Sequence, residues 1–191
     1  MNKRSGIESK KRILTAAIKT FSERGYKGTS MRMIASRAHI SVGGLYLYFR
    51  SKEDLYLTLI KTRLDDLAGR TTEALKDVKD PAEAMRTFLK LRLNYAREHR
   101  ELILALGRDP GFGFGIDVKR KFFRQQRQVI EGILKKGIAS GRFRECNTEE
   151  VAKVIFSLVR GFIASLVIEP DALFSPEECC VLILTGLLRR D

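Results

Sequence analysis

Apolar side chains recur at helical spacing along almost the whole chain. In three short segments near the N-terminus they fall at or near the i, i+3, i+4 and i+7 positions of one helix face. These residues are Leu14, Ala17, Ile18 and Phe21, then Met31, Ile34, Ala35 and Ala38, then Val42, Leu45, Tyr46 and Phe49. Gly25 is a typical C-terminal stop for the first helix, and Ser30 and Ser41 can cap the N-termini of the other two. The pattern predicts three short helices, with a tight turn at 38–41 between the second and the third.

The same spacing predicts six further helices. Their expected ranges are 51–78, 81–99, 101–107, 116–140, 148–168 and 175–190. The chain has only 4 prolines and 15 glycines, and the one clear linker is the sequence DPGFGFG at 109–115. We therefore predict an all-α protein with a three-helix head over residues 1–50 and a helical body over residues 51–191.

Charge is distributed very unevenly between the two ends of the chain. The 36 Lys and Arg residues outnumber the 23 Asp and Glu residues, so the formal net charge is +13. Residues 1–64 hold 14 of the basic and 4 of the acidic residues, a surplus of +10, whereas residues 65–191 have a surplus of only +3. A strongly basic N-terminal part, followed by a remainder that is nearly neutral, indicates a polyanionic partner for the N-terminal part. Nucleic acid is the first candidate and an anionic membrane surface the second.

Three short helices with a tight turn between the last two form a helix-turn-helix pattern, and here this pattern carries the basic excess. Helical phase predicts that Gly43, Gly44, Leu47 and Tyr48 face away from the small core. Because an α-helix fits the major groove of DNA, this face would meet the bases. The flanking residues that can bind phosphates are Lys27, Thr29, Ser30, Arg32, Arg37, Arg50 and Lys52.

The run from Phe21 to Leu55, FSERGYKGTSMRMIASRAHISVGGLYLYFRSKEDL, resembles the DNA-binding domain of the TetR/AcrR family of bacterial one-component transcriptional regulators. The motifs F-x-x-x-G-Y, T-S-x-R-x-I-A, S-x-G-x-L-Y-x-Y-F and S-K-E-x-L occur together and in register. The likeness spans roughly residues 8–60, and a weaker one covers 133–161.

The resemblance implies a cytoplasmic homodimer whose variable C-terminal domain binds a small-molecule effector and releases an operator in double-stranded DNA, most simply as a repressor. It implies phosphate contacts from Thr29, Ser30, Tyr46 and Lys52. It places Ser41, Val42, Gly43, Gly44, Leu47 and Tyr48 on or near the bases.

One departure from the family pattern concerns the turn. His39 stands where the turn usually has glycine. We therefore expect a non-glycine residue in the left-handed region there, at some cost in stability.

A second departure concerns how bases would be read. Val42 and Gly44 replace residues that are more often polar, and Leu47 is apolar where a hydrogen-bonding side chain is common. Such a face offers no bidentate hydrogen bonds to guanine or adenine, so we expect reading through thymine methyl groups, Tyr48, Arg32 and DNA shape. The alternative is that the glycines only allow close packing and other residues read the bases.

The two C-terminal helices are apolar on more than one face, so they need cover on two sides. One cover can be the protomer's own core, and the other is most simply a second copy of the same helices around a two-fold axis. The residues predicted at this dimer interface are Ile155, Leu158, Phe162, Leu166, Ile183, Leu184 and Leu187. The alternative is a helix pair that is merely well buried within one protomer.

Polar residues interrupt two apolar stripes of the body. Such a mostly apolar setting with a few polar groups is the usual form of a small-molecule site. The predicted effector-binding residues are Met85, Phe88, Arg92 and His99 on the fifth helix and Lys119, Phe122, Phe123 and Gln126 on the seventh. We expect an amphipathic effector with an anionic or polar head near Arg92, such as a fatty acid or an acyl thioester. In the alternative, Arg92 pairs with an internal carboxylate such as Asp65, Asp66 or Glu131, or extends to water.

Other function classes have weaker support. Neither of the two histidines lies in a recognisable catalytic motif and no close Cys/His pair suits a metal, so we predict no enzyme, no metal site and no cofactor. The most apolar stretches, 161–168 and 179–188, are shorter than the ~20 residues that span a bilayer. Cys179 and Cys180 are adjacent and suit buried structural thiols in a reducing cytosol better than a redox sensor. The rival is a basic protein that binds nucleic acid or anionic membranes without sequence preference.

Overall fold

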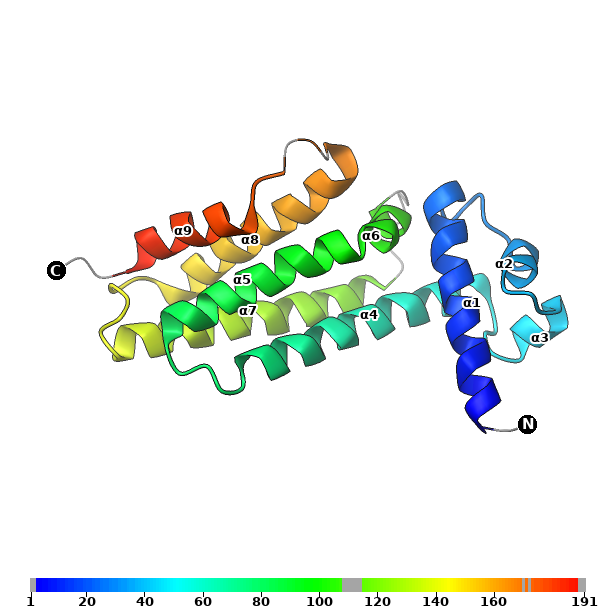
Figure 1. Cartoon of the computed structure of the whole chain (residues 1–191), viewed down its shortest axis with the longest axis horizontal. Helices are drawn as coiled ribbons and strands as arrows, with labels where there is room; N and C mark the ends of the chain where they lie inside the picture. Colours follow the sequence, from blue (N-terminus) through cyan, green and yellow to red (C-terminus); the bar gives the residue numbers. More distant parts are fainter. Residues whose placement is uncertain (1–2, 108–114, 170, 172, 189–191) are drawn as a thin grey trace. The chain divides into compact units, whose positions relative to one another are not determined.

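Helices form the regular structure of the described part of the chain, which comprises residues 3–107, 115–169, 171 and 173–188 of a computed structural model. They are α1 (Lys3–Arg24), α2 (Met31–Arg37), α3 (Val42–Tyr46), α4 (Lys52–Leu75), α5 (Pro81–Glu98), α6 (Arg100–Gly107), α7 (Ile116–Ala139), α8 (Thr148–Ile168) and α9 (Pro176–Leu187) (Figure 1). The all-α prediction is confirmed.

Most predicted helix ends are correct to within three residues because they depend on local capping chemistry. At the N-termini of six of the described helices a side-chain oxygen of the cap residue accepts a backbone N–H bond, and the cap residues are Ser30, Ser41, Ser51, Asp80, Asn147 and Ser175. Gly25 has φ 67°, as expected for a residue that stops a helix. α4 ends three residues before the expected position 78. The predicted linker lies, apart from Gly115, outside the described residues, as does the expected end of the last helix.

The chain divides into two compact units, residues 1–64 with 100–116 and residues 65–99 with 117–191. The predicted boundary at residue 50 lies inside the first unit, because the first part of α4 and the whole of α6 also belong to it. α6 packs against α1 within this unit. Its core is closed by fully buried side chains from α1 to α4, among them Phe21, Ile34, Leu45, Phe49 and Leu55.

The second unit contains the end of α4 together with α5, α7, α8 and α9. α5 packs against both α8 and α9, and its Met85, Phe88 and Leu89 are almost completely buried. The loop after α7 is held to the end of α9, because the Arg144 N–H donates to the Leu187 carbonyl at 3.0 Å.

Candidate functional site

Two serine caps and one left-handed residue fix the turn between α2 and α3. The Ser30 Oγ accepts from the Met33 N–H at 3.3 Å, and the Ser41 Oγ accepts from the Gly44 N–H at 2.9 Å. His39 has φ 53°, so the prediction of a left-handed non-glycine residue in this turn is confirmed. Holding such a residue costs about 1–3 kcal/mol, which the surrounding caps and core must offset.

The exposed side of α3 is small and apolar. Leu47 is 80% exposed and Tyr46 is 50% exposed, whereas Tyr48 is half-buried against the core of the head. Helical phase had placed Tyr46 inward and Tyr48 outward, and this prediction was wrong because both residues lie at the edges of the face that buries Leu45 and Phe49, and the five-residue α3 is too short for the phase to define those edges. A Cβ on Gly44 would lie 3.0 Å from the Ser41 Oγ, so this glycine leaves room for the cap.

Two residues predicted to touch phosphates instead hold the loop between α1 and α2. The Lys52 ammonium donates to the carbonyls of Tyr26 and Thr29, both at 2.7 Å, and lies 4.3 Å from the Tyr26 ring centroid. The Thr29 side chain is buried, and its hydroxyl donates to the Gly25 carbonyl at 2.7 Å. Both side chains therefore face inward and organise the backbone beside the N-terminus of α2.

The other predicted phosphate-binding residues of the head lie at its surface. Lys27, Ser30, Arg32 and Arg50 are exposed. Arg37 is also exposed but pairs with the Glu23 carboxylate at 2.7 Å, and hydrogen bonding to this arginine lowers the pKa of Glu23. Basic residues of α1 and α2 line a groove of about 640 Å³ together with Thr20, Met33, Ser36 and His39, the basic ones being Arg24, Arg32 and Arg37.

In the second unit, Arg92 of α5 is buried, and no charged partner for it occurs among the described residues. It is 3% exposed, and its Nε and Nη2 have no hydrogen-bond partner among the described residues. The guanidinium carbon lies 5.1 Å from the ring centroid of Phe88 and 5.1 Å from that of Phe122. Burial lowers the pKa of Arg92 to about 9, so the side chain is still protonated at neutral pH.

None of the three carboxylates named as partners for Arg92 pairs with it in the described part of the chain. Asp66 accepts from the Tyr95 hydroxyl at 2.9 Å, Glu131 pairs with a lysine one turn further along α7 at 2.6 Å, and Asp65 is exposed. Nor does the arginine extend to water, since almost none of its surface is accessible. A buried cation without an anion costs several kcal/mol, and none of the described residues supplies that anion to Arg92.

A second buried polar group lies one helical turn from Phe122. Gln126 is buried, and its Oε1 also has no hydrogen-bond partner among the described residues. The structure thus brings Arg92, Phe88, Phe122 and Gln126 into one region.

The other four predicted effector-binding residues each have different surroundings. Met85 is fully buried in the core, and Phe123 is half-buried with its ring 5.4 Å from that of Phe156. His99 packs edge-on against Tyr95 with 4.2 Å between ring centroids, and Lys119 is half-buried.

The faces of α8 and α9 that remain exposed differ from the predicted dimer interface. Six of the seven predicted residues are buried within the protomer, namely Ile155, Phe162, Leu166, Ile183, Leu184 and Leu187, and only Leu158 is exposed, at 41%. The other uncovered apolar residues of these two helices are Val154 and Ile168 on α8, at 60% and 81%, and Val181 and Leu182 on α9, at 52% and 73%. Sequence periodicity found both helices but could not tell which apolar stripe faces α5.

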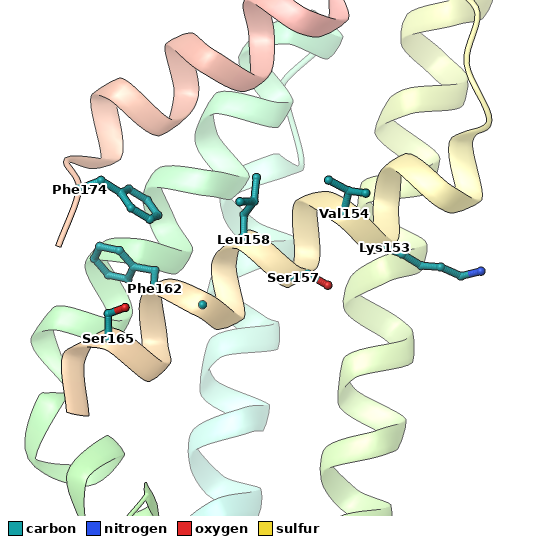
Figure 2. Close-up of a pocket in the computed structure, with 8 residues that line it drawn as sticks. Lys153, Val154, Ser157, Leu158, Phe162, Ser165 and Phe174 are labelled. Carbon is teal, nitrogen blue, oxygen red and sulfur yellow. The ribbon is translucent and has the colours of Figure 1, made fainter. Parts of the chain in front are cut away.

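A groove of about 570 Å³ runs along the exposed side of α8 (Figure 2). Its floor includes Ser157, Gly161 and Ser165, which are spaced four residues apart. Phe162 and Phe174 face each other at one end, with ring centroids 5.0 Å apart, and Lys153 lies at the other. A Cβ on Gly161 would meet no atom within 4 Å, so a second helix can approach closely here.

α8 as a whole is also long and apolar enough to cross a membrane by length and composition, with 33% of that stretch buried. The expectation that every apolar stretch is too short was therefore wrong, since it considered only 161–168. The core helix of a globular protein meets the same criterion, so this property by itself is weak evidence for a membrane span.

Comparison with known proteins agrees with the helix-turn-helix geometry. Residues 13–59 match the family described as bacterial regulatory proteins, tetR family. The chain is 29% identical to the uncharacterised HTH-type transcriptional regulator YhgD of Bacillus subtilis, over 80% of this chain and 81% of the relative. It is 30% identical to the HTH-type transcriptional repressor KstR2 of Mycobacterium tuberculosis, over 69% and 68%.

A solved structure shows the same fold over nearly the whole chain. It is the transcriptional regulator FadR from Bacillus subtilis in complex with stearoyl-CoA, with a TM-score of 0.78 at 21% identity, covering 92% of this chain and 97% of that one. With the family match at residues 13–59 and 30% identity to KstR2 over 69% of this chain and 68% of that relative, the chain belongs to the TetR family of bacterial transcriptional regulators.

Proposed function

We propose that this regulator is a cytoplasmic repressor that binds a palindromic operator as a homodimer and releases it when an amphipathic effector with an anionic head binds beside Arg92. The observation that carries the effector site is the buried guanidinium whose Nε and Nη2 lack partners. An anion that binds here would offset the electrostatic cost of burying the Arg92 charge. The site therefore favours a negatively charged ligand over water or an apolar ligand.

The apolar surroundings of Arg92 support the amphipathic part of this proposal. Phe88, Phe122 and Met85 provide a dry lining on which a hydrocarbon body gains from burial. FadR, which shares the fold, binds stearoyl-CoA, a molecule with a long acyl chain and an anionic head. An effector of this general character is therefore compatible with the family's architecture.

The uncovered faces of α8 and α9 support a dimer. Exposed Val154, Leu158, Val181 and Leu182 leave apolar surface in contact with water, and the small residues along the groove of α8 allow close helix packing. A second copy of the same two helices would cover this surface around a two-fold axis, and it would give the two heads the symmetry of a palindromic site.

DNA binding in this proposal uses the exposed side of α3 and the basic surface around α2. Leu47 and Gly43 can approach base edges and thymine methyl groups, whereas Arg32, Lys27 and Arg50 can contact phosphates. Few side-chain hydrogen bonds to bases are available from α3, so sequence preference would depend strongly on DNA shape.

A hydrogen bond links α5, near Arg92, to the part of α4 that lies in the second unit. Tyr95, three residues after Arg92 on α5, donates its hydroxyl to Asp66 on α4 at 2.9 Å, and Asp66 also pairs with Arg70 at 3.3 Å. Because Arg92 and Phe88 are almost fully buried, a ligand can enter only if α5 and its neighbours move apart. Such a movement would reach α4, the helix that continues into the head, and shift the population away from the DNA-binding state.

The test begins with operator selection. The full-length protein is used to enrich binding sites from a random DNA pool, and the enriched sites are then examined for two-fold symmetry. Complexes with the selected DNA are challenged with long-chain acids and acyl thioesters, and release is followed by fluorescence anisotropy. Enriched palindromes that are released by a member of this panel support the proposal. Binding without sequence preference, by a chain that stays monomeric, would contradict it and favour a non-specific polyanion binder.

A further inference from the structure

We infer that the anionic head of the effector is a free carboxylate with a single negative charge, held by two parallel hydrogen bonds from Arg92. This inference rests on the proposed function, since it assumes that Arg92 is the anchor of the effector. It goes further by separating free acids from the thioesters and phosphate esters that share an acyl body.

The first argument is the geometry of the unpaired nitrogens. Nε and Nη2 of Arg92 both lack partners, and they form one edge of the planar guanidinium, from which two N–H bonds point in the same direction. The two oxygens of a carboxylate match this edge, so that two charge-assisted hydrogen bonds form side by side. The rings of Phe88 and Phe122 contact the guanidinium and restrict its orientation.

The second argument is the balance of charge in the site. Arg92 is protonated at neutral pH and provides one positive charge, while the nearby carboxylates considered as partners are bonded elsewhere or exposed. A carboxylate neutralises this charge completely. A phosphate monoester carries about −1.5 to −2 at pH 7 and would leave negative charge in a dry region. A thioester carbonyl is neutral, so it would leave the arginine uncompensated.

The third argument is the single amide beside Phe122. Gln126 is buried with its Oε1 unpaired, and an amide that turns about its last torsion angle can present N–H to an anion instead. The two N–H groups of the guanidinium edge and one amide N–H can all donate hydrogen bonds to the two oxygens of a carboxylate. The other residues that line this region, Met85, Phe88 and Phe122, are apolar and suit the hydrocarbon body.

The test compares matched ligands on the full-length protein bound to its selected operator. Saturated free acids of six to sixteen carbons are compared with alcohols, alkyl phosphates and CoA thioesters of the same chain length, by operator release and by calorimetry. We expect the acid of the best length to bind about 10- to 100-fold more tightly than the matched alcohol, the range for hydrogen bonds to charged groups. The thioesters and phosphates are expected to be weaker than the acid.

Variants at Arg92 supply the second readout. Arg92→Lys keeps the charge but removes the paired N–H edge and should weaken acid binding about tenfold. Arg92→Met should abolish the preference for acids over alcohols. Arg124→Met, which changes an exposed arginine on α7, is the matched control and should leave both affinities unchanged. Circular dichroism confirms that each variant is folded.

The outcomes distinguish the inference from the proposed function. If thioesters or alkyl phosphates bind as tightly as the acids, or if Arg92→Met keeps the preference for acids, the carboxylate inference is overturned while effector-dependent release stands. If no compound of the panel binds, the inference is likewise overturned. In that case release of the operator by a cell metabolite extract, lost in Arg92→Met, would still support the proposed function, and its absence would overturn that as well.

Discussion

Replacing Arg92 with methionine is expected to make the folded protein more stable, although it removes a charged side chain from the centre of the second unit. The guanidinium is 3% exposed and has two nitrogens without partners. Methionine is also long and unbranched, fills a similar space against Phe88 and Phe122, and has no group that requires a hydrogen bond. The substitution therefore removes a desolvation cost and preserves most of the packing.

The size of the effect follows from the pKa of Arg92 and from its aromatic contacts. Burial lowers that pKa from its usual value to about 9, and at about 1.4 kcal/mol per pKa unit this corresponds to a cost of about 5 kcal/mol for keeping the charge. The two rings at 5.1 Å return about 1–2 kcal/mol each through cation–π attraction. The variant should gain about 1–3 kcal/mol, which corresponds to about 2–4 °C in Tm per kcal/mol for a chain of this size.

The pH dependence gives this prediction a specific signature. Below about pH 9 the folded protein holds the proton on Arg92 and the full cost is present. Above this value the unfolded chain, in which the pKa of the arginine is higher, keeps a proton that the folded protein has lost, so the stability contribution of Arg92 becomes more favourable as pH rises. The difference in stability between the variant and the parent should therefore be constant from pH 6 to 8 and smaller at pH 10.

Urea unfolding followed by circular dichroism measures this difference, because the midpoint shifts at constant slope when only stability changes. Parent and variant are compared at equal protein concentration, since a dimer's stability depends on it. Arg124→Met is the control and should lie within about 0.5 kcal/mol of the parent, as is usual for exposed positions. A loss of more than 1 kcal/mol in Arg92→Met would refute the reasoning, since it would mean that the folded protein satisfies this guanidinium.

The same substitution should abolish the response to an acidic effector. A substitution can stabilise a protein and remove its function at the same time. This is expected where a binding site contains a side chain that lowers stability in the free protein but is needed to bind the ligand. Stability and operator release measured on one preparation would show whether the two effects occur together. A variant that is more stable and still releases DNA with acids would separate the buried charge from effector binding.

Four further predictions follow from other contacts. Lys52→Met should destabilise the head by about 1–3 kcal/mol, as it removes two charge-assisted hydrogen bonds to the loop between α1 and α2, and a lowered urea midpoint would show this. Leu158→Glu should shift the protein to monomers in sedimentation, whereas an unchanged mass would exclude this face from the dimer. Leu47→Ala should weaken operator binding without changing Tm, and equal DNA affinity would place base contacts elsewhere. Gln126→Glu should supply an internal partner for the buried arginine, raise Tm and compete with acidic effectors in calorimetry.

Local chemistry explains why so much of the fold was predictable. Helix starts depend on one side chain that accepts a nearby N–H, as at Ser30 and Ser41, and such signals lie within four residues of sequence. The left-handed turn residue His39 was predictable for the same reason. Errors arose where a helix is too short for its rotation to be extrapolated, as with Tyr46 and Tyr48 beside the five-residue α3.

The candidate sites were predicted less completely because they depend on neighbours that are distant in sequence. Thr29 and Lys52 matched a motif in which they would touch DNA, yet here their side chains bond the loop between α1 and α2. The exposed stripe of α8 and α9 was assigned to the wrong residues because both stripes are apolar, and only the position of α5 determines which one is covered.

The amino-acid sequence by itself determined the helices, their caps, the basic head and the family, because these depend on periodicity, short-range hydrogen bonds and composition. Only the tertiary structure decided that none of the described carboxylates pairs with Arg92 and that Val154 and Leu182, rather than Ile155 and Leu184, remain uncovered. Whether a charge is paired or an apolar side chain is covered depends on which helices pack together. Residues that are far apart in sequence meet only after folding. Both the unpaired cation and the uncovered apolar surface can therefore be recognised only in the tertiary structure.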